Sequence, residues 1–125
     1  TGGTWSVSII DQDNLAATMA VGPMGSTNTL SDIAIGAQGG DGPGNARLNA
    51  GALYVVRGHA TLPVQTDLST TPAAIQVDGQ VTNSLLSRTA SGIAVGDLDG
   101  DGKGDVCVSS FANAGYVACF RSQFP

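Results

Sequence analysis

Charged residues are scarce in this 125-residue chain, and basic residues especially so. Only 12% of the residues are charged, with five Lys and Arg against ten Asp and Glu, so the net charge at pH 7 is −5. A chain without a basic stripe neutralises few phosphates, so we do not expect nucleic acid as a partner. No apolar run approaches the length of a transmembrane helix, and we therefore expect no insertion into a membrane.

Good helix formers are also rare, whereas glycine is abundant. The chain has no Glu and one Lys, and 18 residues are Gly, a composition that disfavours helices. Short runs of Val, Ile, Thr and Ala alternate with clusters of Gly, Asp, Asn and Ser. Such runs predict an all-β fold with many tight connections, in a chain long enough to bury a core as one domain.

The sequence contains two copies of one pattern. Residues 19–37 (MAVGPMGSTNTLSDIAIGA) align with residues 93–110 (IAVGDLDGDGKGDVCVSS). Further along, residues 50–58 (AGALYVVRG) align with residues 114–122 (AGYVACFRS). Each copy predicts three strands, and AAIQV at 73–77 predicts a fourth strand for the first copy. Internal repeats of this kind are typical of stacked or radial architectures.

These residues resemble FG-GAP repeats, the blades of integrin α-type β-propellers. The resemblance rests on GIAVGDLDGDGKGDV followed by AGYVACF, and on SDIAIGA followed by GALYVVRG. It implies two four-stranded blades of a partial propeller, completed by strand exchange or by a longer chain. Residues 1–12 would then be the closing strand of a neighbouring blade, residues 13–80 a first blade without metal, and residues 81–125 a second blade with a calcium loop.

The stretch GDLDGDGKGD, residues 96–105, concentrates carboxylates in one short loop. Alternate residues of a tight loop point inward, so we expect Asp97, Asp99 and Asp101 to converge on one centre. The Lys103 backbone carbonyl and Asp105 would complete the ligand shell. Oxygen ligands in this number are those that Ca²⁺ prefers. The loop therefore predicts a calcium site, and the alternative is a solvated acidic turn without an ion.

Other metal sites fit this loop less well. An EF-hand requires Glu at position twelve and flanking helices, but position twelve is Val108 and the sequence around it predicts a strand. Zinc is disfavoured because the chain has one His and no Cys-x-x-Cys, and Mg²⁺ prefers fewer protein ligands. The loop of the first copy, GPMGSTNTLSD at 22–32, keeps only Asp32 as a carboxylate. We predict no metal there.

Both cysteines of the chain lie in the second copy. Cys107 falls in its second predicted strand and Cys119 in its third. If the turn between these strands is centred near Asn113, the two cysteines lie opposite each other in an antiparallel pair, close enough for a disulfide. The alternative is two buried free thiols. A disulfide would imply an oxidising compartment, so we expect a secreted, extracellular or cell-surface protein.

Two classes of function fit these features. The leading hypothesis is an extracellular calcium-binding structural or adhesion module that acts through protein contacts. Its partners would be other extracellular proteins or other copies of itself. The predicted strand 4–10 has no predicted sheet of its own, so in one copy it could complete the last blade of the next copy. Such contacts would give a ring or a filament. The alternative is a carbohydrate-binding or enzyme-associated propeller fragment of a larger secreted protein, which would bind glycans. No residues suggest an activated water with a general base, so we expect no enzymatic activity.

Overall fold

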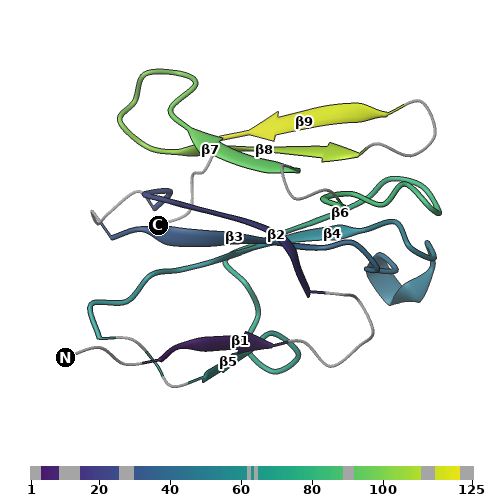
Figure 1. Ribbon diagram of the computed structural model, residues 1–125, viewed down its shortest axis with the longest axis horizontal. Helices are drawn as coiled ribbons and strands as arrows, with labels where there is room; N and C mark the ends of the chain where they lie inside the picture. Colours follow the sequence, from purple (N-terminus) through teal and green to yellow (C-terminus); the bar gives the residue numbers. More distant parts are fainter. Residues whose placement is uncertain are drawn as a thin grey trace.

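The chain is all-β in the computed structural model, which describes residues 4–8, 15–25, 30–61, 63, 65–88, 92–110 and 115–121. Within these residues, nine strands form three small sheets (Figure 1). The predicted all-β fold class is confirmed. The strands, in chain order, are β1 (Ser6–Ser8), β2 (Leu15–Gly22), β3 (Asp32–Ala37), β4 (Ala52–Val56), β5 (Gln65–Asp67), β6 (Ile75–Asp78), β7 (Ile93–Gly96), β8 (Asp105–Ser110) and β9 (Tyr116–Phe120), with one 3₁₀ turn, η1 (Pro43–Asn45), between β3 and β4.

The two sequence copies fold to the same plan. The first gives an antiparallel sheet of order β2-β3-β4-β6, and the second gives an antiparallel sheet of order β7-β8-β9. Equivalent pairs occupy the same register, since Ala34 lies opposite Val55 in the first sheet and Cys107 lies opposite Cys119 in the second. The predicted fourth strand at 73–77 is observed as β6, hydrogen-bonded to β4.

A hydrophobic core fills the space between these two sheets. Leu53 and Val55 of β4 are fully buried in it, together with Val106 and Val108 of β8. Because side chains of a strand alternate between its faces, these residues at every second position line the same side of each sheet. Burying each such side chain contributes about 1.5–3 kcal/mol, so this core fixes the position of the second sheet on the first.

The other face of the four-stranded sheet is covered by a pair of short strands, β1 and β5. Figure 1 shows this pair on the opposite side from β7–β9. Tyr54 and Ala52 of β4 are buried there in a second cluster, against which Leu68 packs just after β5. All five residues of β4 are therefore buried, whereas residues of β9 alternate between half-buried and exposed.

The expectation that the opening strand has no sheet of its own is wrong. Residues Ser6–Ser8 pair in parallel with Gln65–Asp67 of the same chain, and the Trp5 indole Nε1 donates a hydrogen bond to Thr66 Oγ1 at 2.9 Å. The segment QTD is polar throughout and shows no period of two, so no hydrophobic pattern predicts a strand at β5. Residues 9 and 10 of the predicted strand lie outside the described residues.

The disulfide between Cys107 and Cys119 is present and confirms the predicted pairing. It joins β8 to β9 on the side of the sheet away from the central core, because Val106 and Val108 face the core. Asn113, near which the turn was predicted to be centred, lies outside the described residues. In the part of the chain that is described, no helix is long and apolar enough to cross a membrane.

Replacing both Cys107 and Cys119 by Ala should lower the free energy of unfolding by about 2–3 kcal/mol. The bridge closes a segment with a sequence separation of 12, so its removal gives the unfolded chain more conformational freedom. Denaturant unfolding of both proteins measures the loss. A reducing agent should reproduce the loss in the wild-type chain and leave the double variant unchanged; equal stability of the oxidised wild type and the double variant would contradict the prediction.

Candidate metal centre

The acidic loop connects two strands of the second sheet. It leaves β7 at Gly96 and enters β8 at Asp105, and these two residues are directly opposite each other in the ladder. The flanking elements are strands, as predicted when the EF-hand was excluded. The pairing of β7 with β8 therefore fixes both ends of the loop, and the loop lies at one end of the three-stranded sheet (Figure 1).

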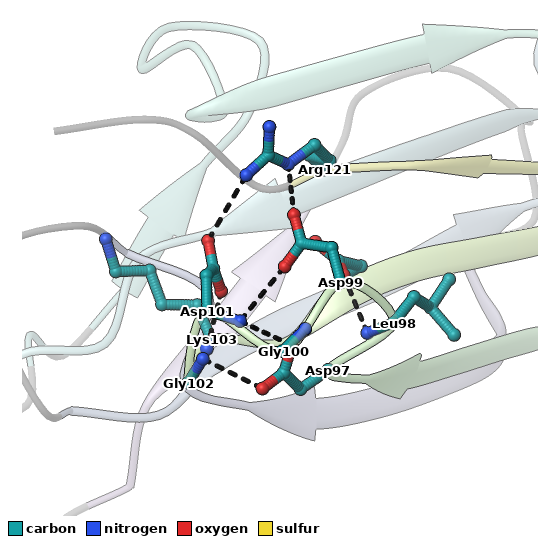
Figure 2. Close-up of polar contacts among 9 residues, drawn as sticks. Asp97, Leu98, Asp99, Gly100, Asp101, Gly102, Lys103 and Arg121 are labelled. Atoms are coloured by element: carbon teal, nitrogen blue, oxygen red, sulfur yellow. Dashed lines mark hydrogen bonds and ion pairs between the residues drawn. The ribbon is translucent and has the colours of Figure 1, made fainter.

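The loop is wrapped around the carboxylate of Asp97. Asp97 Oδ1 accepts hydrogen bonds from the backbone N–H groups of Gly100 (2.7 Å) and Asp101 (3.1 Å), and Oδ2 accepts one from Gly102 (2.8 Å), as Figure 2 shows. These hydrogen bonds lower the pKa of Asp97 below its ordinary value, and the bond from Gly102 has the largest effect. Gly100 and Gly102 have φ of 81° and 86°, which glycine adopts without the strain of a Cβ.

Three carboxylates of this loop lie together. One oxygen each from Asp97, Asp99 and Asp105 fall within 4.8 Å of one another, an arrangement that could hold a metal ion. Asp105 is 3% exposed, and its Oδ2 accepts a hydrogen bond from the Leu98 backbone N–H at 2.8 Å. Carboxylates this close repel one another, so the group is favourable for a cation placed among them.

Asp101 lies outside this group of three. Its Oδ1 accepts a hydrogen bond from the Lys103 backbone N–H at 2.9 Å, and its Oδ2 is 3.7 Å from Nη2 of Arg121. Arg121 also forms an ion pair through Nε with Oδ2 of Asp99. Figure 2 shows the Lys103 side chain extending away from the carboxylates, as expected for a residue that would offer only its backbone carbonyl.

Sequence reasoning did not identify Arg121 as part of this site. The residue comes 16 positions after Asp105, and β9 carries it back to the loop because β9 runs antiparallel to β8. A signal was nevertheless present, since Arg121 aligns with Arg57 in the repeat and each directly follows the third strand of its copy.

The first copy uses its equivalent carboxylate differently. Asp32 is 1% exposed, and its Oδ2 accepts hydrogen bonds from the backbone N–H groups of Met24 and Gly25, both at 2.9 Å. Its Oδ1 accepts another from Gly58, also at 2.9 Å. Asp32 therefore organises its loop through the backbone.

The two loops meet at the same end of the molecule. Gly104, at the end of the acidic loop, donates its backbone N–H to the carbonyl of Pro23 in the first loop at 2.7 Å. The strands that precede the two loops, β2 and β7, are in contact as well. The acidic loop is thus anchored to its own sheet by Asp105 and to the neighbouring sheet by Gly104.

Comparison with known proteins adds no assignment to this geometry. The sequence matches no protein-family model and no curated protein.

Replacing Asp32 by Ala should lower the free energy of unfolding by about 2–4 kcal/mol, because three backbone N–H groups lose their acceptor and two of them are buried. Asp32→Asn should lose less, since the amide oxygen still accepts. Urea unfolding measures both changes. Asp78→Ala removes the same charge and one exposed contact, and is expected to stay within about 0.5 kcal/mol of wild type; a similarly small change for Asp32→Ala would contradict the assigned role.

Proposed function

We propose that this chain is an extracellular structural or adhesion module of the FG-GAP type, stabilised by Ca²⁺ and acting through protein–protein contacts. The observation that carries the proposal is the group of Asp97, Asp99 and Asp105, whose oxygens lie within 4.8 Å of one another in a loop between two strands. The repeated sheet plan and the sequence resemblance support the family. The proposed role of the ion is structural.

Calcium is the cation that these ligands favour. The group offers carboxylate oxygens only, and Ca²⁺ takes six to eight oxygens at flexible geometry. Asp101 and the Lys103 carbonyl lie in the same loop and are the further ligands that we propose, with water completing the shell. Structural zinc sites are built mainly from Cys and His, but the disulfide occupies both cysteines and the chain has one His.

An extracellular location supports this choice of ion. The Cys107–Cys119 disulfide is the kind of bond that forms and persists in oxidising environments. Extracellular calcium sites often have dissociation constants of about 10⁻⁴–10⁻³ M. A cation in the loop would offset the repulsion among the carboxylates and fix the loop that bonds to Pro23 of the first copy.

Calcium should raise the stability of the protein, whereas a chelator should not. At 10 mM CaCl₂ and a dissociation constant near 10⁻³–10⁻⁴ M, binding to the folded state adds about 1.4–2.7 kcal/mol. Thermal unfolding in CaCl₂, in MgCl₂ and in EGTA measures this gain, which we expect to be largest in CaCl₂.

The matched variants for this experiment are Asp97→Asn and Asp78→Asn. Both remove one negative charge, but only Asp97 belongs to the group of three carboxylates. We expect Asp97→Asn to abolish most of the calcium-dependent gain and Asp78→Asn to retain it. The same melting temperature for the wild-type protein in CaCl₂ and in EGTA would contradict the calcium site.

The second sheet also supports action through protein contacts. In the first sheet β6 pairs with the outer edge of β4. β9 is equivalent to β4 in the repeat, but among the described strands it is the edge strand of its sheet. Leu53 of β4 is fully buried, but Val117, its equivalent on β9, is 69% exposed. The edge of β9 offers backbone N–H and C=O groups for pairing with another strand, and the exposed Val117 lies on the face of this sheet that points away from the central core. We propose that another copy of the chain, or another extracellular protein, completes this sheet.

The pairing of β1 with β5 constrains how a second copy would supply the strand. One edge of β1 is already paired within its own chain. A head-to-tail exchange would therefore require β1 to leave β5, or to offer its other edge while still paired. Such a contact joins two different surfaces, so it gives a ring if the rotation closes and a filament if it does not.

Self-assembly through β9 should be visible in the particle mass. We expect light scattering to give a mass above the 12.4 kDa of one chain as the concentration rises. Val117→Lys should return the mass toward one chain, because a charge on an edge strand opposes pairing. Val81→Lys is the control, since Val81 is 51% exposed and lies outside the strands. A wild-type mass of one chain at every concentration would contradict self-assembly.

A further inference from the structure

We propose that Arg121 tunes the cation affinity of the acidic loop by holding Asp101, and one oxygen of Asp99, away from the ion. The inference rests on the proposed function of the loop and concerns its regulation. It assigns a role to the residue that directly follows β9, a strand that contributes no carboxylate to the site. The loop would then be controlled by the position of that strand.

The contacts of Arg121 divide the carboxylates of the loop into two sets. Asp97 and Asp105 are held by backbone N–H groups within the loop. Asp99 Oδ1 accepts a hydrogen bond from the Asp101 backbone N–H, and Asp99 Oδ2 forms an ion pair with the Arg121 guanidinium. Figure 2 shows the guanidinium bridging Asp99 and Asp101 on the side of the loop away from Asp97.

Asp101 lies apart from the other three carboxylates, although Arg121 contacts both Asp99 and Asp101. Asp97, Asp99 and Asp105 bring oxygens within 4.8 Å of one another, whereas the Asp101 carboxylate lies between its own loop backbone and Arg121. A guanidinium offers a rigid fork of donors that matches two acceptor oxygens. A cation that took Asp101 as a ligand would have to replace this partner.

The strength of the bridge suits a tuning role. The Arg121 side chain is 58% exposed, and those of Asp99 and Asp101 are 29% and 32% exposed. Ion pairs at this exposure are weak and screened by solvent, so a divalent ion can displace the arginine. Its positive charge also repels the ion, and the two effects together are expected to weaken binding about three- to tenfold.

The repeat shows that an arginine at this position need not serve such a role. Arg57 follows β4 as Arg121 follows β9, but the adjoining loop of the first copy has Asp32 as its one carboxylate. Arg57 lines a cavity of about 240 Å³ with His59 and Thr66. The arginine thus occurs in both copies, and only the second copy places it against an acidic loop.

Calorimetric titration with CaCl₂ of four proteins tests the proposal: the wild type, Arg121→Gln, Asp101→Asn and the double variant. We expect Arg121→Gln to bind Ca²⁺ about three- to tenfold more tightly than wild type. Arg121→Gln is expected to release Asp101 for the ion. Asp101→Asn should therefore weaken Ca²⁺ binding more in the Arg121→Gln background than in the wild type, by a further factor of at least about three. A double-mutant cycle measures this coupling.

Two further variants separate this effect from charge and from folding. Arg47→Gln removes the same unit of charge from a residue that bonds the Gln80 carbonyl, and we expect its affinity to stay within about twofold of wild type. Arg121→Lys keeps the charge without the planar fork, and should give a smaller gain than Arg121→Gln. Circular dichroism in EGTA confirms that each variant is folded before titration.

The outcomes distinguish the role of Arg121 from the site itself. Calcium binding by the wild type with no gain in Arg121→Gln, or an equal gain in Arg47→Gln, would overturn the tuning role and leave the proposed function standing. If the effects of Arg121→Gln and Asp101→Asn on calcium affinity are additive, the inference that Arg121 holds Asp101 away from the ion is overturned. Failure of every folded variant to bind calcium at millimolar concentration would overturn the proposed function together with this inference.

Discussion

The arrangement of this protein depends on a buried carboxylate at the first residue of each middle strand. Asp32 and Asp105 occupy equivalent positions in the two repeats, and both accept hydrogen bonds from backbone N–H groups of the preceding loop. A buried charge is costly unless it is hydrogen-bonded, so each loop is bound to the sheet that follows it. Among the described residues, the carboxylate of the first repeat accepts hydrogen bonds from backbone N–H groups, whereas that of the second also faces Asp97 and Asp99.

Burial differs between the two sheets because their neighbours differ. The four-stranded sheet has a layer on each face, so Leu53 and Tyr54, adjacent residues on opposite faces of β4, are both buried. Within the described part of the chain, the three-stranded sheet is covered on one face only, and Val117 on its other face is exposed. One repeated sequence plan thus gives one enclosed sheet and one half-covered sheet. The half-covered sheet carries the disulfide, the acidic loop and the open edge.

Much of this architecture could be predicted from the sequence because local patterns and the repeat determine it. The strand pattern and the Cys107–Cys119 register follow from alternation and from one turn position, and the acidic loop is a continuous stretch. The pairing of β1 with β5 could not be predicted, because it joins polar segments 59 positions apart, Ser6 with Gln65. Arg121 was missed for a related reason, since its contact with Asp99 depends on the antiparallel return of β9.

The disulfide limits how far the chain can be drawn out under mechanical load. If the two ends of the polypeptide are pulled apart, β9 can be peeled from β8 only outside the Cys107–Cys119 bridge. The segment between the cysteines, with its sequence separation of 12, corresponds to about 40 Å of fully extended chain. That length stays locked while the bond is oxidised. The pulling force would therefore act on the acidic loop before it could separate β8 from β9 in the segment between the two cysteines.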